Sequence, residues 1–477
     1  MTASSLIADS LARDLLSAIT AGVLLAGIAW IAIKRPALAM LYFFVFLSFA
    51  WRLGSVVYID LLGPLPSEQL ERNIGPGISA VPLALSQGMV VAALLFSFRG
   101  RRLLALRDTY PPLPALITTG RFKLSNLAFG AIALFVIALW IELFVRGPIP
   151  LFAAMERFDY SRLYGGPLHQ RLMEWGPMLA FQIGVFFVAP TLHDQPFDRR
   201  FGALFASLLV YLFLVGHRFS SFYVYSCFFI IPIGAVLLGR EASGLRARRL
   251  FTGTALRNFW IAGIALLLLI VVAVTYSYTV VRKFEGGQLL SKLSQRILVQ
   301  QGEMWWMTYE RIFVQGQWNG GFAAYKLFVE PFEPTRNSTM QLLMELGLPL
   351  ERAHFILRAG SAYTGGWPEV WFELGGPIGG FVLVALSAFL FSEFMFLITR
   401  CIIEERFATC FFLTPLLYAL SITVAAGMVN SFVQVTLVIK AAAALVVLVV
   451  ENRWRSGLIT APSTASSRSQ PRPRREA

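Results

Sequence analysis

Residues 363–389 read YTGGWPEVWFELGGPIGGFVLVALSAF, and this stretch decides the class of fold. From Phe381 onward the sequence stays strongly apolar to about residue 398. A run of about 20 apolar residues is long enough to cross the roughly 30 Å hydrocarbon core of a bilayer. The first half of the stretch is different, because Glu369 and Glu373 lie one helical turn apart and pairs of glycines follow them. The sequence therefore predicts a membrane-spanning helix with acids at its entrance.

Composition and hydropathy place the whole chain in a membrane. Of its 477 residues, 57% are hydrophobic and 14% are charged, and the mean hydropathy is +0.65. A soluble protein of this length needs far more charged surface. The apolar runs are continuous, whereas the strands of a membrane β-barrel alternate apolar and polar residues. These observations predict an all-α polytopic membrane protein.

About eleven apolar runs are long enough to be membrane-spanning helices, and they divide the chain into four parts. The expected spans are residues 14–33, 37–59, 79–98, 124–145, 174–192, 201–216, 219–238, 258–280, 368–398, 409–428 and 431–450. The expected domains are an N-terminal membrane domain of about eight spans (1–280), a long helical loop (281–367), C-terminal membrane helices (368–450) and a disordered basic tail (451–477).

The net charge of +14 is concentrated between spans, which argues against nucleic acid as a partner. Arginine and lysine gather in alternate connections, at 34–35, 99–123, 199–200 and 240–257, and again in the tail. The positive-inside rule places these segments in the cytoplasm. An odd number of spans then puts the N-terminus outside and the C-terminus inside. The lipid bilayer is the expected partner, and the loop 281–367 lies on the outer face.

The loop carries helix signals of its own. Apolar residues recur at near-helical spacing in 289–314, which predicts a helix lying flat in the outer headgroup region. In this interpretation Trp305 and Trp306 are interfacial anchors. Two shorter helices are expected after it. A capping-box pattern begins the first at Ser338, and a proline begins the second just before Leu350.

The second short helix presents three polar residues on one face. Glu351, His354 and Arg358 are spaced i, i+3 and i+7, so the acid is placed to orient the imidazole while the arginine supplies positive charge. A solvated helix face with a passing ion pair is the alternative. The position of the trio, directly before the glycine-rich stretch, favours a functional interpretation.

The segment 214–222, LVGHRFSSF, places two more polar residues where two apolar runs meet. His217 and Arg218 are costly there unless they face a cavity or a partner, or reach the interface. A guanidinium is well shaped for phosphate or diphosphate. Arg52 and Glu142 also lie inside or near spans, and pairing with each other is the simplest expectation.

No cofactor motif is present in the sequence. The three cysteines and four histidines lack the spacing of a metal site or a disulfide framework, and phosphate-binding and dinucleotide fingerprints are absent. Neither a metal nor another cofactor is expected. No internal repeat stands out, which weakens the case for an inverted-repeat transporter.

The layout resembles the Wzy-type polymerases of oligosaccharide repeat units, which belong with the O-antigen ligases. The resemblance rests on many spans, a large late outer loop, an arginine near the outer end of a middle span and a T-x-x-x-P…(D/E)-x-G-x-x-G segment. The residues that carry it are Gly216, His217, Arg218, Tyr363, Thr364, Pro368, Glu373, Gly375, Gly376 and Gly379.

This resemblance implies a metal-independent glycosyltransferase of the C-type (GT-C) fold in the bacterial inner membrane. It implies that undecaprenyl-diphosphate-linked oligosaccharides are joined into a surface polysaccharide, with a chain-length regulator protein as a further partner. By the same resemblance, Arg218 and Arg336 bind the diphosphate, and the general base is Glu373 or His354. The remaining candidates are Glu369 for catalysis, and His217, Arg358 and Tyr363 for substrate binding.

Three other functions remain open at this stage. A lipid-linked sugar flippase or transporter would show ionisable residues near mid-bilayer and repeated halves. A glycosyltransferase that uses a polyprenyl monophosphate donor would place an acid in the first outer loop, where Asp60 is available. An O-antigen ligase differs only in its acceptor. The glycine pairs 375/379 and 376/380 are interpreted as small-xxx-small contacts that bring the acids of their helix against arginine-bearing spans.

Overall fold

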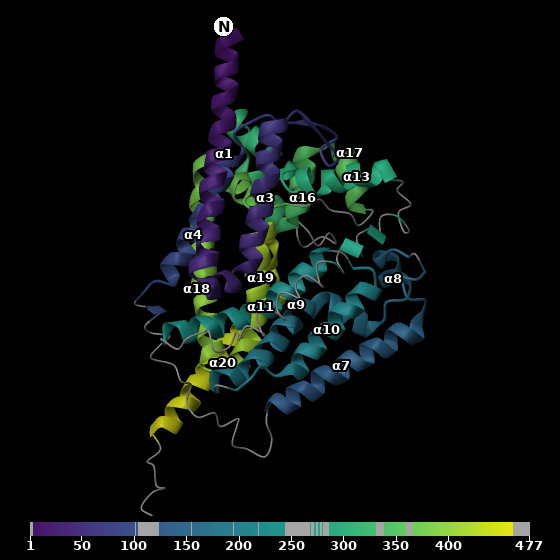
Figure 1. Cartoon of the computed structure of the whole chain (residues 1–477), viewed down its shortest axis with the longest axis vertical. Helices are drawn as coiled ribbons and strands as arrows, with labels where there is room; N and C mark the ends of the chain where they lie inside the picture. The colour runs from purple at the N-terminus through teal and green to yellow at the C-terminus, as the bar shows by residue number, and fades with distance from the viewer. Residues whose placement is uncertain are drawn as a thin grey trace, which may run out of the picture.

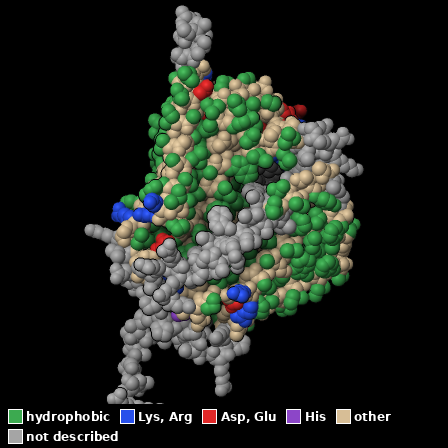
Figure 2. Space-filling model, viewed as in Figure 1, with side chains coloured by type: hydrophobic (Ala, Val, Ile, Leu, Met, Phe, Trp, Pro, Cys, Tyr) green, Lys and Arg blue, Asp and Glu red, His purple; other side chains and the backbone are tan. Residues whose placement is uncertain are grey.

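The computed structural model confirms an all-α polytopic membrane protein. It describes residues 3–100, 102–103, 124–153, 155–193, 195–217, 219–243, 268, 271–272, 275–276, 279, 286–330, 338–358 and 365–460. Within these ranges, the helices long and apolar enough to cross a membrane are Ser10–Lys34, Phe43–Leu62, Ala80–Ser97, Leu124–Arg146, Pro167–His193, Ser220–Ala242, Glu369–Ile403, Phe407–Ala426 and Val435–Arg453. Hydrophobic side chains cover most of the face shown in Figure 2.

Most of the described residues in the first half of the chain are helical, and one short hairpin lies among them. Its elements are α1 (Ala3–Lys34), α2 (Pro36–Leu41), α3 (Phe43–Leu62), β1 (Leu65–Ser67), β2 (Arg72–Ile74), α4 (Ala80–Ser97), α7 (Leu124–Arg146), α8 (Arg157–Leu163), α9 (Pro167–Val188), the 3₁₀ turn η1 (Ala189–His193), α10 (Arg199–Leu214) and α11 (Phe219–Ala242). β1 and β2 pair antiparallel, with Leu65 opposite Ile74.

The second half begins with the loop and ends with three long helices. Its elements are α13 (Gly286–Ser294), η4 (Gln295–Val299), α14 (Glu303–Tyr309), η5 (Glu310–Val314), α15 (Gly320–Ala324), η6 (Tyr325–Val329), α16 (Ser338–Gly347), α17 (Leu350–Arg358), α18 (Glu369–Ile403), α19 (Phe407–Ala426), η8 (Val429–Val433) and α20 (Val435–Thr460). Helices α16 and α17 are the two short helices expected in the loop.

Two of the eleven expected spans are not matched by a long helix among the described residues. The run 201–216 forms α10, which has 16 residues and is therefore about 24 Å long, less than the roughly 30 Å of a hydrocarbon core. The run 258–280 lies mostly outside the described residues. The other nine expected runs coincide with long apolar helices.

The helices form two groups with different directions (Figure 1). α1, α3 and α18 follow the long axis of the molecule, whereas α7 is clearly inclined to it. The start of α1 and the loop helices α13, α16 and α17 lie toward one end, and α20 runs toward the other. The loop and the N-terminus therefore share an end.

Aromatic side chains join the long helices in the core. The ring of Tyr42, between α2 and α3, lies edge-on to Phe98 after α4 at 5.9 Å and to Phe391 of α18 at 6.0 Å. Each such pair contributes about 0.5–1.5 kcal/mol beyond the burial of its area. These contacts fix α18 against α4, and α18 is the helix that carries Glu369 and Glu373.

Trp305 and Trp306 are not the interfacial anchors that the sequence predicted. Their side chains are buried, with 0% and 7% exposed. Nε1 of Trp305 donates to the backbone oxygen of Ser79 at 2.7 Å, and its ring lies edge-on to Phe372 of α18. The expected single helix over 289–314 is instead divided by η4 and η5, which allows α14 to pack inward against the membrane helices.

Candidate functional site

The first acid of α18, Glu369, forms a buried ion pair with Arg52 of α3. Nη2 of Arg52 donates to Oε1 of Glu369, and Nη1 donates to the backbone oxygen of Trp367. The two side chains are 7% and 0% exposed. The expected pairing of Arg52 with Glu142 is wrong. Glu142 instead accepts from the backbone N–H groups of Leu168 and His169, at the first turn of α9.

The second acid, Glu373, faces the loop. Its Oε2 lies 3.6 Å from Nη2 of Arg311 in η5, and its side chain is 1% exposed. The hydroxyl of Thr308, on α14, also interacts with this carboxylate. Oε1 of Glu373 and Nε of Arg311 are buried and have no hydrogen-bond partner among the described residues. Glu369 therefore pairs with an arginine of α3, and Glu373 lies beside an arginine of η5.

The glycines after Glu373 form a kink, and the small-xxx-small interpretation of them is wrong. Gly376 has φ 68° and ψ −168° inside α18, a conformation that is essentially restricted to glycine. A Cβ at Gly376 would lie 3.0 Å from the indole of Trp318, and one at Gly380 would collide with Phe372. The glycines therefore let the first two turns of α18 fold back under aromatic side chains, and do not receive a second helix.

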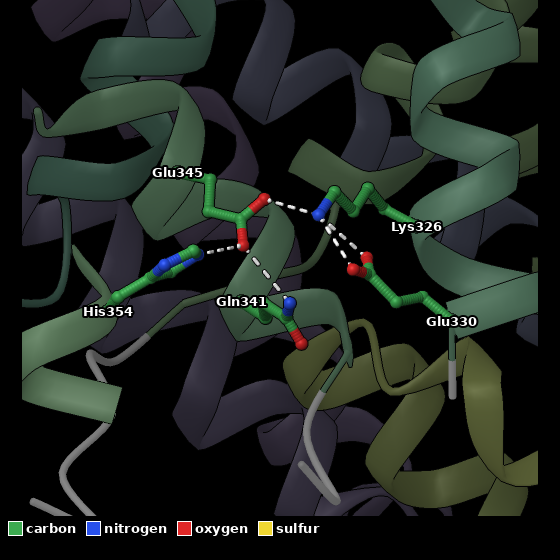
Figure 3. Close-up of polar contacts among 5 residues, drawn as sticks. All are labelled: Lys326, Glu330, Gln341, Glu345 and His354. Atoms are coloured by element: carbon green, nitrogen blue, oxygen red, sulfur yellow. Dashed lines mark hydrogen bonds and ion pairs between the residues drawn. The ribbon is translucent and has the colours of Figure 1, made fainter. Parts of the chain in front are cut away.

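The loop holds a polar cluster that joins three of its elements (Figure 3). We call it the Glu345 cluster. Its members are Lys326 near the start of η6, Glu330 directly after η6, Gln341 and Glu345 on α16, and His354 on α17.

Glu345 is the centre of this cluster. Nζ of Lys326 lies 2.9 Å from Oε2 of Glu345 and 2.7 Å from Oε2 of Glu330. Nε2 of Gln341 donates to Oε1 of Glu345 at 3.0 Å, and Nε2 of His354 lies 3.0 Å from the same oxygen. The side chain of Glu345 is 2% exposed, whereas that of His354 is 40% exposed. The cluster therefore fixes a buried carboxylate behind an accessible imidazole.

The arrangement resolves which acid orients His354. Glu351, expected to do so from the same helix, is exposed, and the acid that contacts the ring is Glu345 from the preceding helix. A carboxylate only accepts, so the ring proton lies on Nε2 and the lone pair on Nδ1. An imidazole held in one tautomer by a carboxylate is the arrangement of a general base.

Charge in the Glu345 cluster is balanced by its own hydrogen bonds. Burial alone would raise the pKa of Glu345, but hydrogen bonds from Lys326, Gln341 and His354 outweigh it and lower that pKa. Burial opposes the charge of Lys326, yet the carboxylates of Glu330 and Glu345 outweigh it and raise the lysine pKa. Glu345 therefore stays ionised at neutral pH.

A 15-residue repeat builds this part of the loop, contrary to the expectation that the chain has no internal repeat. Residues 295–300 read QRILVQ, 310–315 read ERIFVQ and 325–330 read YKLFVE. Each copy closes one π-helical turn with an equivalent hydrogen bond. The bonds are Gln300 N–H to Gln295 O, Gln315 N–H to Glu310 O and Glu330 N–H to Tyr325 O. Such turns occur frequently at functional sites.

The repeat also accounts for two cations that the motifs above do not include. Its second position is Arg296, Arg311 or Lys326, so each copy presents one cation. Arg311 and Lys326 each face a buried glutamate, Glu373 and Glu345 respectively. The 15-residue period of basic, aliphatic, apolar and valine positions is the signal that identifies both cations.

The predicted substrate-binding residues are only partly placed by the structure. Arg358 is exposed at the end of α17, one helical turn after His354 and on the same face. Arg218, Arg336 and Tyr363 lie outside the described residues. In the sequence, Arg336 is two residues before the start of α16.

His217 belongs to a different polar group from the Glu345 cluster. It is 8% exposed, and its Nδ1 lies 2.7 Å from the hydroxyl of Ser221. Burial, with contributions from Arg157 and His169, lowers the pKa of His217 to about 3. Its imidazole is therefore neutral at physiological pH and adds no positive charge for a diphosphate.

Asp60 is the acid that the monophosphate-donor alternative requires. In the structure its carboxylate is used in hydrogen bonds within the protein. Its carboxylate accepts from the hydroxyls of Ser17 and Ser79 and from the backbone N–H of Ala80, at 3.1, 2.7 and 2.8 Å. These bonds satisfy the N-terminus of α4, where orphan N–H groups favour a carboxylate. Asp60 is fully buried, so its oxygens are used within the protein.

Comparisons with known proteins add one match. Residues 333–440 match a family of unknown function, DUF6418. The match covers Glu345, His354, Glu369 and Glu373, and it begins after Arg311 and Lys326. No curated protein and no solved structure matches the chain. Within the part of the chain that the structure describes, no group of three or more His, Cys, Asp or Glu side chains could hold a metal ion.

Proposed function

We propose that this chain is a membrane-embedded glycosyltransferase of the C-type class that polymerises undecaprenyl-diphosphate-linked oligosaccharide repeat units. It acts at the outer face of the bacterial inner membrane, with the N-terminus and the loop outside and the C-terminus in the cytoplasm. The growing glycan is transferred from its undecaprenyl diphosphate to the end of another lipid-linked unit. A chain-length regulator is a further partner.

The observation that carries this proposal is the Glu345–His354 pair. It places an accessible imidazole, oriented by a buried carboxylate, in the loop that shares one end of the molecule with the N-terminus. A hydroxyl acceptor needs a base within hydrogen-bond reach, and Nδ1 of His354 offers a lone pair there. Of the two bases that the resemblance left open, His354 suits this role better, because a buried carboxylate orients its ring, whereas the carboxylate of Glu373 faces the guanidinium of Arg311.

The proposed step is one displacement with inversion. His354 Nδ1 takes the proton of the acceptor hydroxyl as that oxygen forms a bond to the anomeric carbon of the donor. The bond from that carbon to the phosphate oxygen breaks, and its electron pair leaves with undecaprenyl diphosphate. Diphosphate is a good leaving group, so positioning and positive charge supply much of the catalysis.

The other predicted residues take supporting roles in this proposal. Arg358 lies one turn from His354 and supplies positive charge to the diphosphate, together with Arg336 and Arg218. Tyr363 and His217 remain substrate-binding candidates on the strength of the resemblance. Glu369, bound to Arg52, holds the start of α18 in place for the reaction.

Deletion of the gene in its own bacterium tests this function. Surface polysaccharide should be lost, and single repeat units should accumulate on undecaprenyl diphosphate, as measured by gel electrophoresis and mass spectrometry of lipid extracts. Normal polymerisation in the deletion strain contradicts the proposal. Full-length polymer that stays on undecaprenyl diphosphate also contradicts it, and identifies a ligase.

Complementation tests the site with a matched pair of histidines. His354→Gln should fail to restore polymer although the protein is present at the normal level in the membrane. His193→Gln is the control, because Nε2 of His193 also contacts a glutamate, Glu405, at 2.9 Å. Glu405 lies beyond the far end of α18, and the part of this helix after the kink at Gly376, residues 377–403, extends about 40 Å. Equal activity of both variants would exclude His354 as the base.

A further inference from the structure

Arg311 and Lys326 occupy the same position in two copies of the 15-residue repeat, and each lies beside a buried glutamate. The side chains of Glu373 and Glu345 are 1% and 2% exposed, and those of Arg311 and Lys326 are 16% and 13% exposed. The same structural unit therefore presents a cation to a buried carboxylate twice. Only the Glu345 copy has a role in the proposed function.

One buried oxygen of each carboxylate, Oε2 of Glu345 and Oε1 of Glu373, has no hydrogen-bond partner among the described residues, but the two copies differ in how closely the cation approaches and in which other groups bind the carboxylate. Glu345 receives Lys326 at 2.9 Å and hydrogen bonds from Gln341 and His354. At Glu373 the cation is 3.6 Å away, beyond the usual range of a hydrogen bond. Among the described residues, Oε1 of Glu373 and Nε of Arg311 have no hydrogen-bond partner. A buried acceptor and a buried donor thus remain unpaired at the Glu373–Arg311 ion pair, and leaving such groups unpaired is unfavourable.

The chemistry of this pair selects the group that fits it. A phosphate is repelled by the carboxylate, and an ammonium is repelled by the guanidinium. A hydroxyl satisfies both partners, because it donates to a carboxylate oxygen and accepts from an N–H. We propose that Glu373 and Arg311 bind a sugar hydroxyl of the lipid-linked oligosaccharide. This inference rests on the proposed function for the identity of the sugar.

Aromatic side chains beside the pair support a sugar as the ligand. Nε1 of Trp318 donates to the backbone oxygen of Glu373 at 2.9 Å, and its ring covers the backbone of Gly376. The Trp318 side chain is 50% exposed, and through Nε1 it is bound directly to the backbone of Glu373. Trp371, one turn before Gly375, has a buried Nε1 without a partner among the described residues. Indole faces stack on the apolar faces of sugar rings, while the hydroxyls at the ring edge reach the charged pair.

A binding measurement separates the sugar contact from the diphosphate contact. The purified full-length chain in lipid nanodiscs is titrated with two probes, and each Kd is measured by microscale thermophoresis. One probe is the lipid-linked oligosaccharide extracted from the deletion strain, and the other is undecaprenyl diphosphate without sugar. Glu373→Leu and Arg311→Gln should each raise the Kd for the first probe at least tenfold. The Kd for undecaprenyl diphosphate should stay within twofold.

The matched control is Glu393→Gln on the same helix. Glu393 pairs with Arg102 at 2.5 Å and accepts from Ser97, 20 residues further along α18 than Glu373. Both of its Kd values should equal those of the wild type. Size-exclusion chromatography identifies a variant that fails to fold, and the other variant at the pair then decides the result.

Every outcome of the binding measurement either supports or contradicts the proposed sugar contact. If the wild type binds the oligosaccharide probe and both variants at the pair bind it equally well, the inference is wrong while the proposed function stands. An equal loss for both probes also overturns it, because the pair then acts on the diphosphate. If the deletion strain accumulates no lipid-linked oligosaccharide, the proposed function fails and this inference fails with it.

Discussion

Arg52 and Glu369 form a buried ion pair although 317 positions separate them in the sequence. The same guanidinium holds the backbone oxygen of Trp367, and the Trp367 ring stacks on Phe49 with a centroid distance of 4.7 Å. α3 therefore fixes the turn from which α18 begins. Glu369 and Glu373, the two acids in the first turns of α18, depend on this anchor for their positions.

Removing one partner of this pair should destabilise the protein more than removing both. Arg52→Met leaves Glu369 as an uncompensated buried charge, a change that typically costs roughly 3–5 kcal/mol. Arg52→Met combined with Glu369→Gln removes that charge and should recover most of the loss. Thermal unfolding in nanodiscs measures the difference.

The control for the pair experiment is the single variant Arg171→Met. Arg171 and Glu174 form an exposed pair one turn apart on α9, and exposed pairs contribute roughly 0–1 kcal/mol. Its unfolding temperature should match the wild type. A double variant as unstable as Arg52→Met alone would show that packing of the Arg52 side chain, and not its charge, supports the fold.

Glu345→Gln should slow glycosyl transfer with little effect on substrate binding. The amide keeps the size of the side chain but loses the charge that holds Lys326 and orients His354. We expect kcat to fall about 10- to 100-fold, the range attributed to a poorly oriented general base, with KM nearly unchanged. The measurement is polymer formation from lipid-linked oligosaccharide in proteoliposomes.

Glu351→Gln is the matched control for that measurement. Glu351 lies on the same helix as His354, and the sequence placed it as the orienting acid, but in the structure it is exposed. Full activity of Glu351→Gln with reduced activity of Glu345→Gln identifies Glu345 as the partner of His354. The reverse result would restore the sequence interpretation.

The extent to which the sequence predicted the fold depends on whether a feature has a local cause. Apolar runs define their own length, so nine of the expected spans coincide with helices. The bounds of α16, Ser338–Gly347, coincide with the serine and the glycine that the sequence patterns placed at its two ends. Partner choice has no local cause, because it is set by how distant helices pack. The sequence therefore located Arg52 and Glu369 without pairing them.

In the candidate site, too, the sequence predicted the features that have a local cause and missed those that depend on packing between distant segments. His354 and Arg358 were selected from their spacing on one helix, which one sequence shows directly. Glu345 was missed because it acts from the helix before. The glycines at 375–380 were assigned to helix contacts, since composition alone does not distinguish a small-residue interface from a backbone that needs positive φ.

Glu303 should make stability depend on pH. Its side chain is fully buried, and burial raises its pKa to about 7, against opposing contacts with Ser67 and the backbone of Gln69. Since the folded state binds the proton more tightly, this contribution is fully present below about pH 4.5 and is lost as the pH rises through about 7. Glu303→Gln should remove the dependence, which amounts to roughly 3 kcal/mol at most.

Unfolding temperatures of the wild type and Glu303→Gln at pH 5 and pH 8 check this sign. The variant should match the wild type more closely at pH 5 and exceed its stability at pH 8. Comparing the two proteins at each pH cancels the titration of all other groups. A variant that is less stable than the wild type at pH 8 would mean that Glu303 is ionised and paired in the folded protein.

Gly376→Ala should destabilise the start of α18, whereas Gly379→Ala should not. A side chain at 376 must adopt φ 68° and meet Trp318, which costs about 1–3 kcal/mol. A Cβ at 379 meets nothing within 4 Å. Unfolding temperatures in nanodiscs compare the two variants. Equal stability of both variants would contradict the kink.

The 15-residue repeat has a consequence for how this loop varies among related chains. Since equivalent atoms close the π-helical turn in each copy, whole copies can be gained or lost without changing the direction in which the chain leaves the segment. Related loops should therefore differ in length by multiples of fifteen. Each copy carries one basic residue, so the gain or loss of a copy changes by one the number of positive charges that the loop presents to the neighbouring helices.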